Sequence, residues 1–202
     1  MCWKRFKQVG PNVFILWLTT PDAYTQGLLV VDQASGTTDE VVTVATVIPQ
    51  NQIAQSFTPL IPAVGFVQLQ TSIFAISSGE TLVINLRQGA YNGPVVSSTT
   101  PVFLVNKIIQ INTFYFSENV PVTPNQLYFF EPVVLSAGSL DVGYKNPSGY
   151  LGGDAWNNGL QDTGDYWFRE GIVVSEPRAV WFALPGIGAL VCHRGWRRKR
   201  EL

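Results

Sequence analysis

The sequence predicts an all-β protein, an antiparallel β-sandwich or jelly roll, flanked by a targeting segment at each end. Two observations predict the strands. Short runs rich in β-branched and aromatic residues recur through the middle of the chain, and turn residues such as Gly, Pro, Asn and Ser separate them. A third observation argues against helices, because no useful length of this region has apolar residues at a helical spacing. The runs do not repeat one another, which argues against a propeller or solenoid.

The predicted strands can be placed in chain order. The regions with strand composition are 41–48, 65–76, 80–89, 100–116, 125–135 and 165–174. The fourth region, TPVFLVNKIIQINTFYF, is long enough for one long strand or two short ones. Pro124 and Asn125 form a predicted turn before the fifth region. In the last region, DYWFREG, we expect Trp167 in the core and a strand-to-strand ion pair between Arg169 and Glu131.

The N-terminal residues 1–25 are predicted to be a signal peptide. Basic residues at Lys4, Arg5 and Lys7 precede a short apolar stretch over 13–18, and cleavage after Thr25 is plausible. Two alternatives are a misassigned start and an N-terminal strand of the domain.

The C-terminal residues 175–202 read as a short transmembrane helix followed by a basic tail. The uncharged run 179–192 is shorter than the roughly 20 apolar residues of an ordinary span. Arginines and an interfacial Trp can extend such a span, and clustered positive charge stays in the cytoplasm. The alternative is a last strand or helix of the domain with a solvated basic end. The membrane and tail residues are Trp181, Phe182, Leu184, Arg194, Arg197, Arg198, Lys199 and Arg200.

The arrangement of Ser175-Glu176-Pro177, an apolar run and an Arg-rich terminus resembles the PEP-CTERM sorting signal of bacterial surface proteins. In that family the first motif position is Pro, where this chain has Ser175. The resemblance implies export across the inner membrane and anchoring before processing by an exosortase-type membrane enzyme. It also implies a final location at the cell surface or in the extracellular matrix.

The remaining residues 26–174 are enough for one domain with its own core. They hold four cationic and eleven acidic side chains, a net charge of −7, whereas the whole chain has −1. This acidity argues against nucleic-acid binding. Both cysteines, Cys2 and Cys192, and the single histidine, His193, lie outside the domain. The domain therefore has no residues for a disulfide, a thiolate metal site or a Ser-His-Asp triad.

Four segments together resemble a recurring bacterial surface domain that is similar to galactose-binding-like jelly rolls. These segments are QSFTP, TLVINLRQG, VTPNQLYFFEP and DYWFREG, in that order between 55 and 171. The resemblance implies the fold, and it carries no catalytic residues to this chain.

The region 143–167 is the predicted ligand site, because it combines Gly, Asn and Asp with aromatic residues. Aromatic rings can cover the C–H faces of a sugar while polar neighbours bind its hydroxyl groups. The candidate ligand-binding residues are Trp156, Asp154, Asn157, Asn158 and Tyr150. The alternative is a turn-rich crossing between the sheets, with Trp156 packed underneath.

No cofactor is expected, apart from a structural calcium ion that Asp154, Asp162 and Asp165 could bind through carboxylate oxygens. Paired carboxylates could also hydrolyse glycosides, but no spacing selects a pair, so we expect no enzyme activity. The sequence thus favours an exported, non-catalytic surface protein that binds a matrix polysaccharide. The alternatives are a purely structural or adhesive coat component and, third, a carbohydrate-active enzyme.

Overall fold

The computed structural model describes residues 27–36, 43–47, 51–73, 78–105, 107–147 and 149–175. The predicted signal peptide and the predicted C-terminal membrane helix lie outside these residues, as do Glu176 and Pro177 of the sorting motif. Within the described residues, no helix is long and apolar enough to cross a bilayer.

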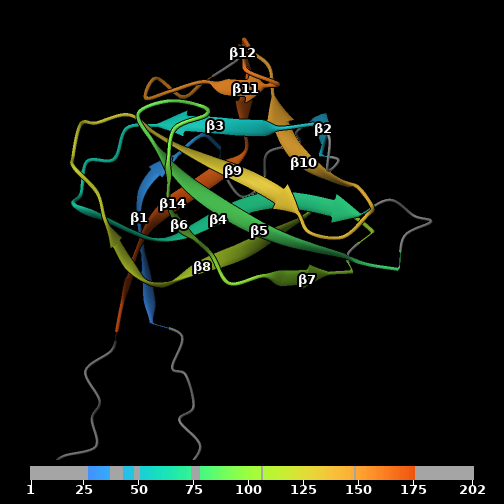
Figure 1. Ribbon diagram of the computed structural model, residues 1–202, viewed down its shortest axis with the longest axis horizontal. Coiled ribbons are helices and arrows are strands. Elements are labelled where there is room, and N and C mark those ends of the chain that lie inside the picture. Colours follow the sequence, from blue (N-terminus) through green and yellow to red (C-terminus); the bar gives the residue numbers. More distant parts are fainter. Residues whose placement is uncertain are drawn as a thin grey trace, which may run out of the picture.

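All regular elements in the described residues are strands, and they form two antiparallel sheets (Figure 1). The first sheet contains β1 (Leu28–Ala34), β2 (Thr43–Val47), β4 (Ala63–Ile73), β8 (Gln110–Pro121), β10 (Leu140–Lys145), β13 (Asp165–Tyr166) and β14 (Phe168–Val174). The second sheet contains β3 (Ile53–Phe57), β5 (Glu80–Gln88), β6 (Val95–Ser98), β7 (Val102–Leu104), β9 (Tyr128–Val134), β11 (Ala155–Asn157) and β12 (Leu160–Gln161). The predicted all-β class is therefore confirmed.

The sheets pack face to face around one hydrophobic core, which makes the domain a β-sandwich. Alternate side chains of each strand point into this core, as the two-residue period of a strand requires. Phe57 packs against Phe130 within the second sheet, and Phe130 meets Phe168 of the first sheet with the ring centroids 5.0 Å apart. Burying a side chain of this size stabilises the fold by about 1.5–3 kcal/mol.

The structure confirms the predicted strands and resolves one ambiguity among them. The region 100–116 contains two strands, β7 and the first part of β8. The 125–135 region contains β9, and Asn125 takes a left-handed φ of 61° in the turn before it. The last predicted strand is divided between β13 and β14 at Trp167, whose side chain is fully buried as predicted. Strands β1, β3, β6 and β10 to β12 were not predicted, because most are short or mix polar residues with apolar ones.

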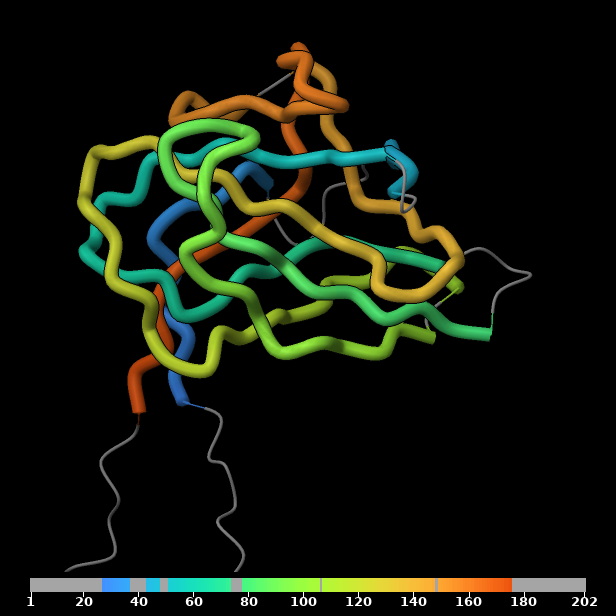
Figure 2. The backbone as a smooth tube through the Cα atoms, viewed as in Figure 1, coloured from blue at the N-terminus to red at the C-terminus, as the bar shows by residue number. Residues whose placement is uncertain are grey.

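The two ends of the described chain lie side by side. Strand β1 pairs antiparallel with β14, and Leu28 lies opposite Val174. Figure 2 shows the blue and red ends of the tube leaving the sandwich together, at the same end of the domain. Both predicted targeting segments therefore connect to the domain at one place.

Candidate functional site

The outer face of the second sheet gathers the polar and aromatic residues of the candidate site. Its strands alternate, so Ala155 and Phe130 enter the core while Trp156 and Glu131 point outward. Trp156 lies opposite Ala54 of β3 and Gln161 of β12. Across the same sheet, Asn85 of β5 lies opposite both Glu131 and Ser98. The strands thus place a row of mainly polar side chains across this face.

Tyr91 and Trp156 form the aromatic centre of this face. Gly89, with a left-handed φ of 78°, turns the chain after β5, and the loop brings Tyr91 over β11. The two rings are stacked with centroids 5.8 Å apart, and Phe129 contacts Trp156 edge-on, also at 5.8 Å. The Tyr91 hydroxyl donates a 2.7 Å hydrogen bond to the carbonyl of Gln52. Burial raises the pKa of Tyr91, so this hydroxyl stays protonated at neutral pH.

Trp156 is therefore only half-exposed. One face of its ring stacks on Tyr91 and Phe129 makes a T-shaped contact with it, so packing covers part of the ring. The indole Nε1 is buried and has no hydrogen-bond partner among the described residues. Tyr91 was not among the predicted site residues. It is the aromatic residue that lies over Trp156, and it comes from a loop distant in the sequence.

Glu131 organises the polar part of the same face. Its carboxylate accepts hydrogen bonds from Gln52 Nε2, from Asn85 Nδ2 at 3.0 Å and from Arg87 Nε at 2.8 Å. Arg87 Nη2 lies 2.8 Å from the same carboxylate, so the two residues form an ion pair. Arg87 also donates from Nη1 to the carbonyl of Gly93, in the loop that carries Tyr91. The network therefore fixes four polar side chains beside the aromatic pair.

The predicted ion pair between Arg169 and Glu131 is wrong. The two residues lie on different sheets, Arg169 on β14 and Glu131 on β9. Arg169 places its guanidinium 5.3 Å from the centroid of the Trp167 ring, and Glu131 pairs with Arg87. The prediction failed because sequence composition does not say which sheet a strand joins.

The other predicted ligand residues are divided between two environments. Asn158 has a left-handed φ of 48°, and its side chain accepts a hydrogen bond from Gln52 N and donates one to Asn51. Asn158 thus lies beside the candidate face. Asn157 has a buried Oδ1 without a hydrogen-bond partner among the described residues. Asp154 is held through its backbone, whose N–H donates to Ser56 Oγ and whose carbonyl accepts from the same hydroxyl.

Tyr150 lies away from the candidate face, in the core. It is 9% exposed, and its ring meets Phe168 edge-on at 5.1 Å. Burial raises the pKa of Tyr150 to about 12. Its hydroxyl donates to Gln33 Oε1 at 3.3 Å. Tyr150 therefore contributes to packing in this structure rather than to the aromatic platform.

Two of the three aspartates considered for calcium, Asp162 and Asp165, have hydrogen-bond donors on their carboxylates. Asp165 is fully buried and accepts hydrogen bonds from Gln55 Nε2, Gly149 N and Tyr150 N. Asp162 accepts from the hydroxyl of Tyr144 and from Thr163 N. In the part of the chain that the structure describes, no three His, Cys, Asp or Glu residues come together to hold a metal ion. Calcium binding stays a prediction, and it would require the donors now bound to Asp162 and Asp165 to move.

A pair of carboxyl groups, those of Asp32 and Glu170, lies between β1 and β14. Glu170 is fully buried, and neither carboxylate oxygen makes a hydrogen bond of ordinary geometry to a described residue. Its neighbours are the carboxyl group of Asp32 and the backbone of Gln33. Burial, and then the charge of Asp32, raise the pKa of Glu170 to about 9. Glu170 is therefore protonated at neutral pH and can donate a hydrogen bond to Asp32.

Comparison with protein-family models gives no match for this chain, and comparison with curated proteins gives none either. A function for this chain is therefore inferred from the geometry of the outer face. The residues that sequence reasoning missed there are Tyr91, Gln52, Asn85, Arg87 and Gln161. The one local signal for them is the Asn-Gly-Pro sequence that follows Tyr91, and this sequence predicts a turn rather than a binding residue.

Proposed function

We propose that this protein is an exported, surface-sorted, non-catalytic protein with a jelly-roll domain. We further propose that the domain binds an extracellular polysaccharide on the outer face of its second sheet. The observation that carries this proposal is the stacked pair Tyr91 and Trp156 beside the hydrogen-bond network of Glu131. Aromatic rings next to oriented polar groups match the alternating C–H faces and hydroxyl groups of a sugar.

The network supports binding because its side chains are already held in place. Asn85, Gln52 and Arg87 all donate to one carboxylate, so little side-chain entropy remains to be lost when a ligand binds. With every carboxyl group counted as ionised, the domain has a formal net charge of −7. This charge disfavours acidic polysaccharides, so the proposed ligand is a neutral one.

The proposed location and partners come from the two ends of the chain. An N-terminal signal peptide and a C-terminal PEP-CTERM-like tail would export the protein and hold it at the membrane until an exosortase-type enzyme acts. The adjacent ends of β1 and β14 support this arrangement, because the domain then lies on one side of both segments. The final site would be the cell surface or the extracellular matrix.

A structural coat component with no defined ligand is the second candidate function. The packing of Trp156 between Tyr91 and Phe129 favours it, because this packing reduces the ring surface left for a sugar. Catalysis is not part of the proposal. The Glu131 carboxylate accepts hydrogen bonds from three side chains and is 4% exposed, an environment that suits a structural role.

Binding of the full-length chain to an array of neutral and acidic glycans tests the proposal. We expect saturable binding to a neutral polysaccharide and a loss of affinity of about fivefold or more in Tyr91→Ala, since one stacked ring contributes about 1 kcal/mol or more. Tyr91 lies in a loop, whereas Trp156 lies on a strand and contacts both Tyr91 and Phe129. The fold should therefore tolerate Tyr91→Ala better than Trp156→Ala.

Tyr115→Ala is the matched control, because Tyr115 is a half-exposed tyrosine on β8 of the opposite sheet. It should leave glycan binding unchanged. An array without signal for the wild-type chain would favour the coat function. Binding that survives Tyr91→Ala would remove this face from the proposal.

A further inference from the structure

Strand β8 carries an unusual bulge where it passes β4. Tyr115 lies opposite Phe66 and Val120 lies opposite Val64. The residues 116–119 therefore all face the single residue Gly65. Such an insertion pushes the extra residues out of the ladder and redirects their side chains.

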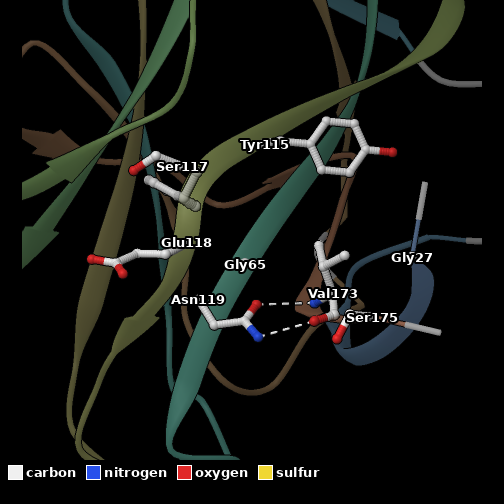
Figure 3. Close-up of a pocket in the computed structure, with 9 residues that line it drawn as sticks. Gly27, Gly65, Tyr115, Ser117, Glu118, Asn119, Val173 and Ser175 are labelled. Carbon is white, nitrogen blue, oxygen red and sulfur yellow. Dashed lines mark hydrogen bonds between the residues drawn. The ribbon is translucent and has the colours of Figure 1, made fainter. Parts of the chain in front are cut away.

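The bulge directs the side chain of Asn119 across Gly65 to β14 (Figure 3). Asn119 Oδ1 accepts a hydrogen bond from Val173 N at 3.0 Å, and Asn119 Nδ2 donates to Val173 O at 3.0 Å. A Cβ atom at Gly65 would overlap Asn119 Oδ1, so glycine is required for this approach. The carboxamide therefore makes the two hydrogen bonds that a residue of a neighbouring strand would make.

These two bonds extend the pairing of β14 beyond the end of its ladder with β4. That ladder ends where Gly171 lies opposite Phe66. On its other edge, β14 pairs with β1 as far as Leu28 opposite Val174. Asn119 thus secures the last residues of β14 on the edge that β4 no longer covers. Ser175 follows immediately, is exposed, and lines a cavity of about 300 Å³ next to Asn119.

We propose that Asn119 is a positioning residue that fixes where the folded domain ends, so that the chain leaves the sheet at Ser175. This inference rests on the proposed sorting function for its biological meaning, because Ser175 begins the sorting motif. We call the two hydrogen bonds between Asn119 and Val173 the clasp. The clasp sets a short, constant distance between the folded domain and the segment on which a membrane processing enzyme acts. Loss of the two Asn119 bonds leaves residues 172–174 paired with β1 alone, so the end of the strand opens more often and that distance becomes longer.

Hydrogen exchange of the Val173 amide in the full-length chain tests the inference. We expect Asn119→Ala to speed this exchange by about tenfold, because losing the two bonds removes about 1.4 kcal/mol of local protection. Asn119→Asp should keep much of the protection, since its carboxylate still accepts from Val173 N although it cannot donate to Val173 O. If Asn119 only affected the stability of the whole domain, Asn119→Ala and Asn119→Asp would not differ in this way at the Val173 amide.

Asn112→Ala is the matched control. Asn112 is another side-chain amide on β8, and it donates to Thr71 Oγ1 at 2.8 Å, away from β14. It should leave the Val173 amide unchanged. Equal Val173 exchange in the wild type and Asn119→Ala would overturn the clasp.

Removal of the C-terminal segment in cells that contain the cognate processing enzyme provides the functional measurement. If Asn119→Ala speeds Val173 exchange and changes the rate of removal relative to Asn112→Ala, the positioning role is supported. If exchange changes but the rate does not, the positioning role is overturned. If the wild-type segment is never removed, the sorting function fails. The exchange rate of the Val173 amide then still shows whether Asn119 holds the end of β14.

Discussion

Asp165→Ala is expected to destabilise the domain by about 3–5 kcal/mol, because it removes one buried acceptor from three donors, two of which belong to the buried residues Gln55 and Tyr150. Asp165 is fully buried, and it accepts from Gln55 Nε2 at 3.1 Å, Gly149 N at 3.1 Å and Tyr150 N at 3.0 Å. These bonds join β3 of one sheet and the loop before β11 to β13 of the other sheet. Urea unfolding of the purified chain, followed by tryptophan fluorescence, would measure the loss.

Asp162→Ala is the matched control for this prediction. Asp162 is also an aspartate that accepts hydrogen bonds, but it is half-exposed. Water can therefore take the place of its carboxylate as the acceptor for Tyr144 and Thr163. We expect a cost of about 1 kcal/mol. An Asp165→Ala variant as stable as Asp162→Ala would contradict the structural role of Asp165.

Glu170→Gln is expected to make the protein more stable above neutral pH. The folded-state pKa of Glu170 is about 9, raised by burial and then by Asp32, whereas an unfolded glutamate has a pKa of about 4.3. Between these values the native state holds a proton that the unfolded state has released. Stability therefore falls as the pH rises through this window, by about 1.4 kcal/mol per unit. Glutamine keeps the shape and a donor for Asp32 without this penalty.

Stability measured from pH 4 to pH 10 for the wild type and for Glu170→Gln would test this sign. The free energy of unfolding of the variant should fall less with pH than that of the wild type. The variant should exceed the wild type most near pH 9 and differ little from it near pH 4. Glu118→Gln is the control, because Glu118 is exposed on β8, and it should keep the wild-type slope. A parallel slope in Glu170→Gln and the wild type would show that Glu170 is not the group responsible.

Much of the strand content could be predicted from the sequence. The run that became β5 has β-branched and aliphatic residues at alternate positions and ends at Gly89, so its strand character and its turn are local properties. The run that became β9 follows a Pro-Asn turn, and this turn is likewise a local property of the sequence. By contrast, β3 and β11 are short and mixed in composition, and they become strands because β9 and β3 respectively pair with them.

The candidate site was predicted only in part. The sequence predicts Trp156 because aromatic and amide residues lie close together around it, and Asn158 does lie beside the same face. The same composition predicts Tyr150, but Tyr150 enters the core, because local composition does not say to which side of the sandwich a loop residue turns. Tyr91 and Arg87 were missed because their partners lie far away in the sequence.

The sequence by itself determined the all-β class, the acidic character of the domain and the chemical contrast between the domain and its two ends. These properties depend on composition and on the period of neighbouring residues, and both are readable along one chain. Only the tertiary structure decided that Glu131 pairs with Arg87, that Tyr91 stacks on Trp156 and that Asn119 reaches Val173. Strand order and register determine those contacts, because shifting a strand by one residue turns each of its side chains to the opposite face.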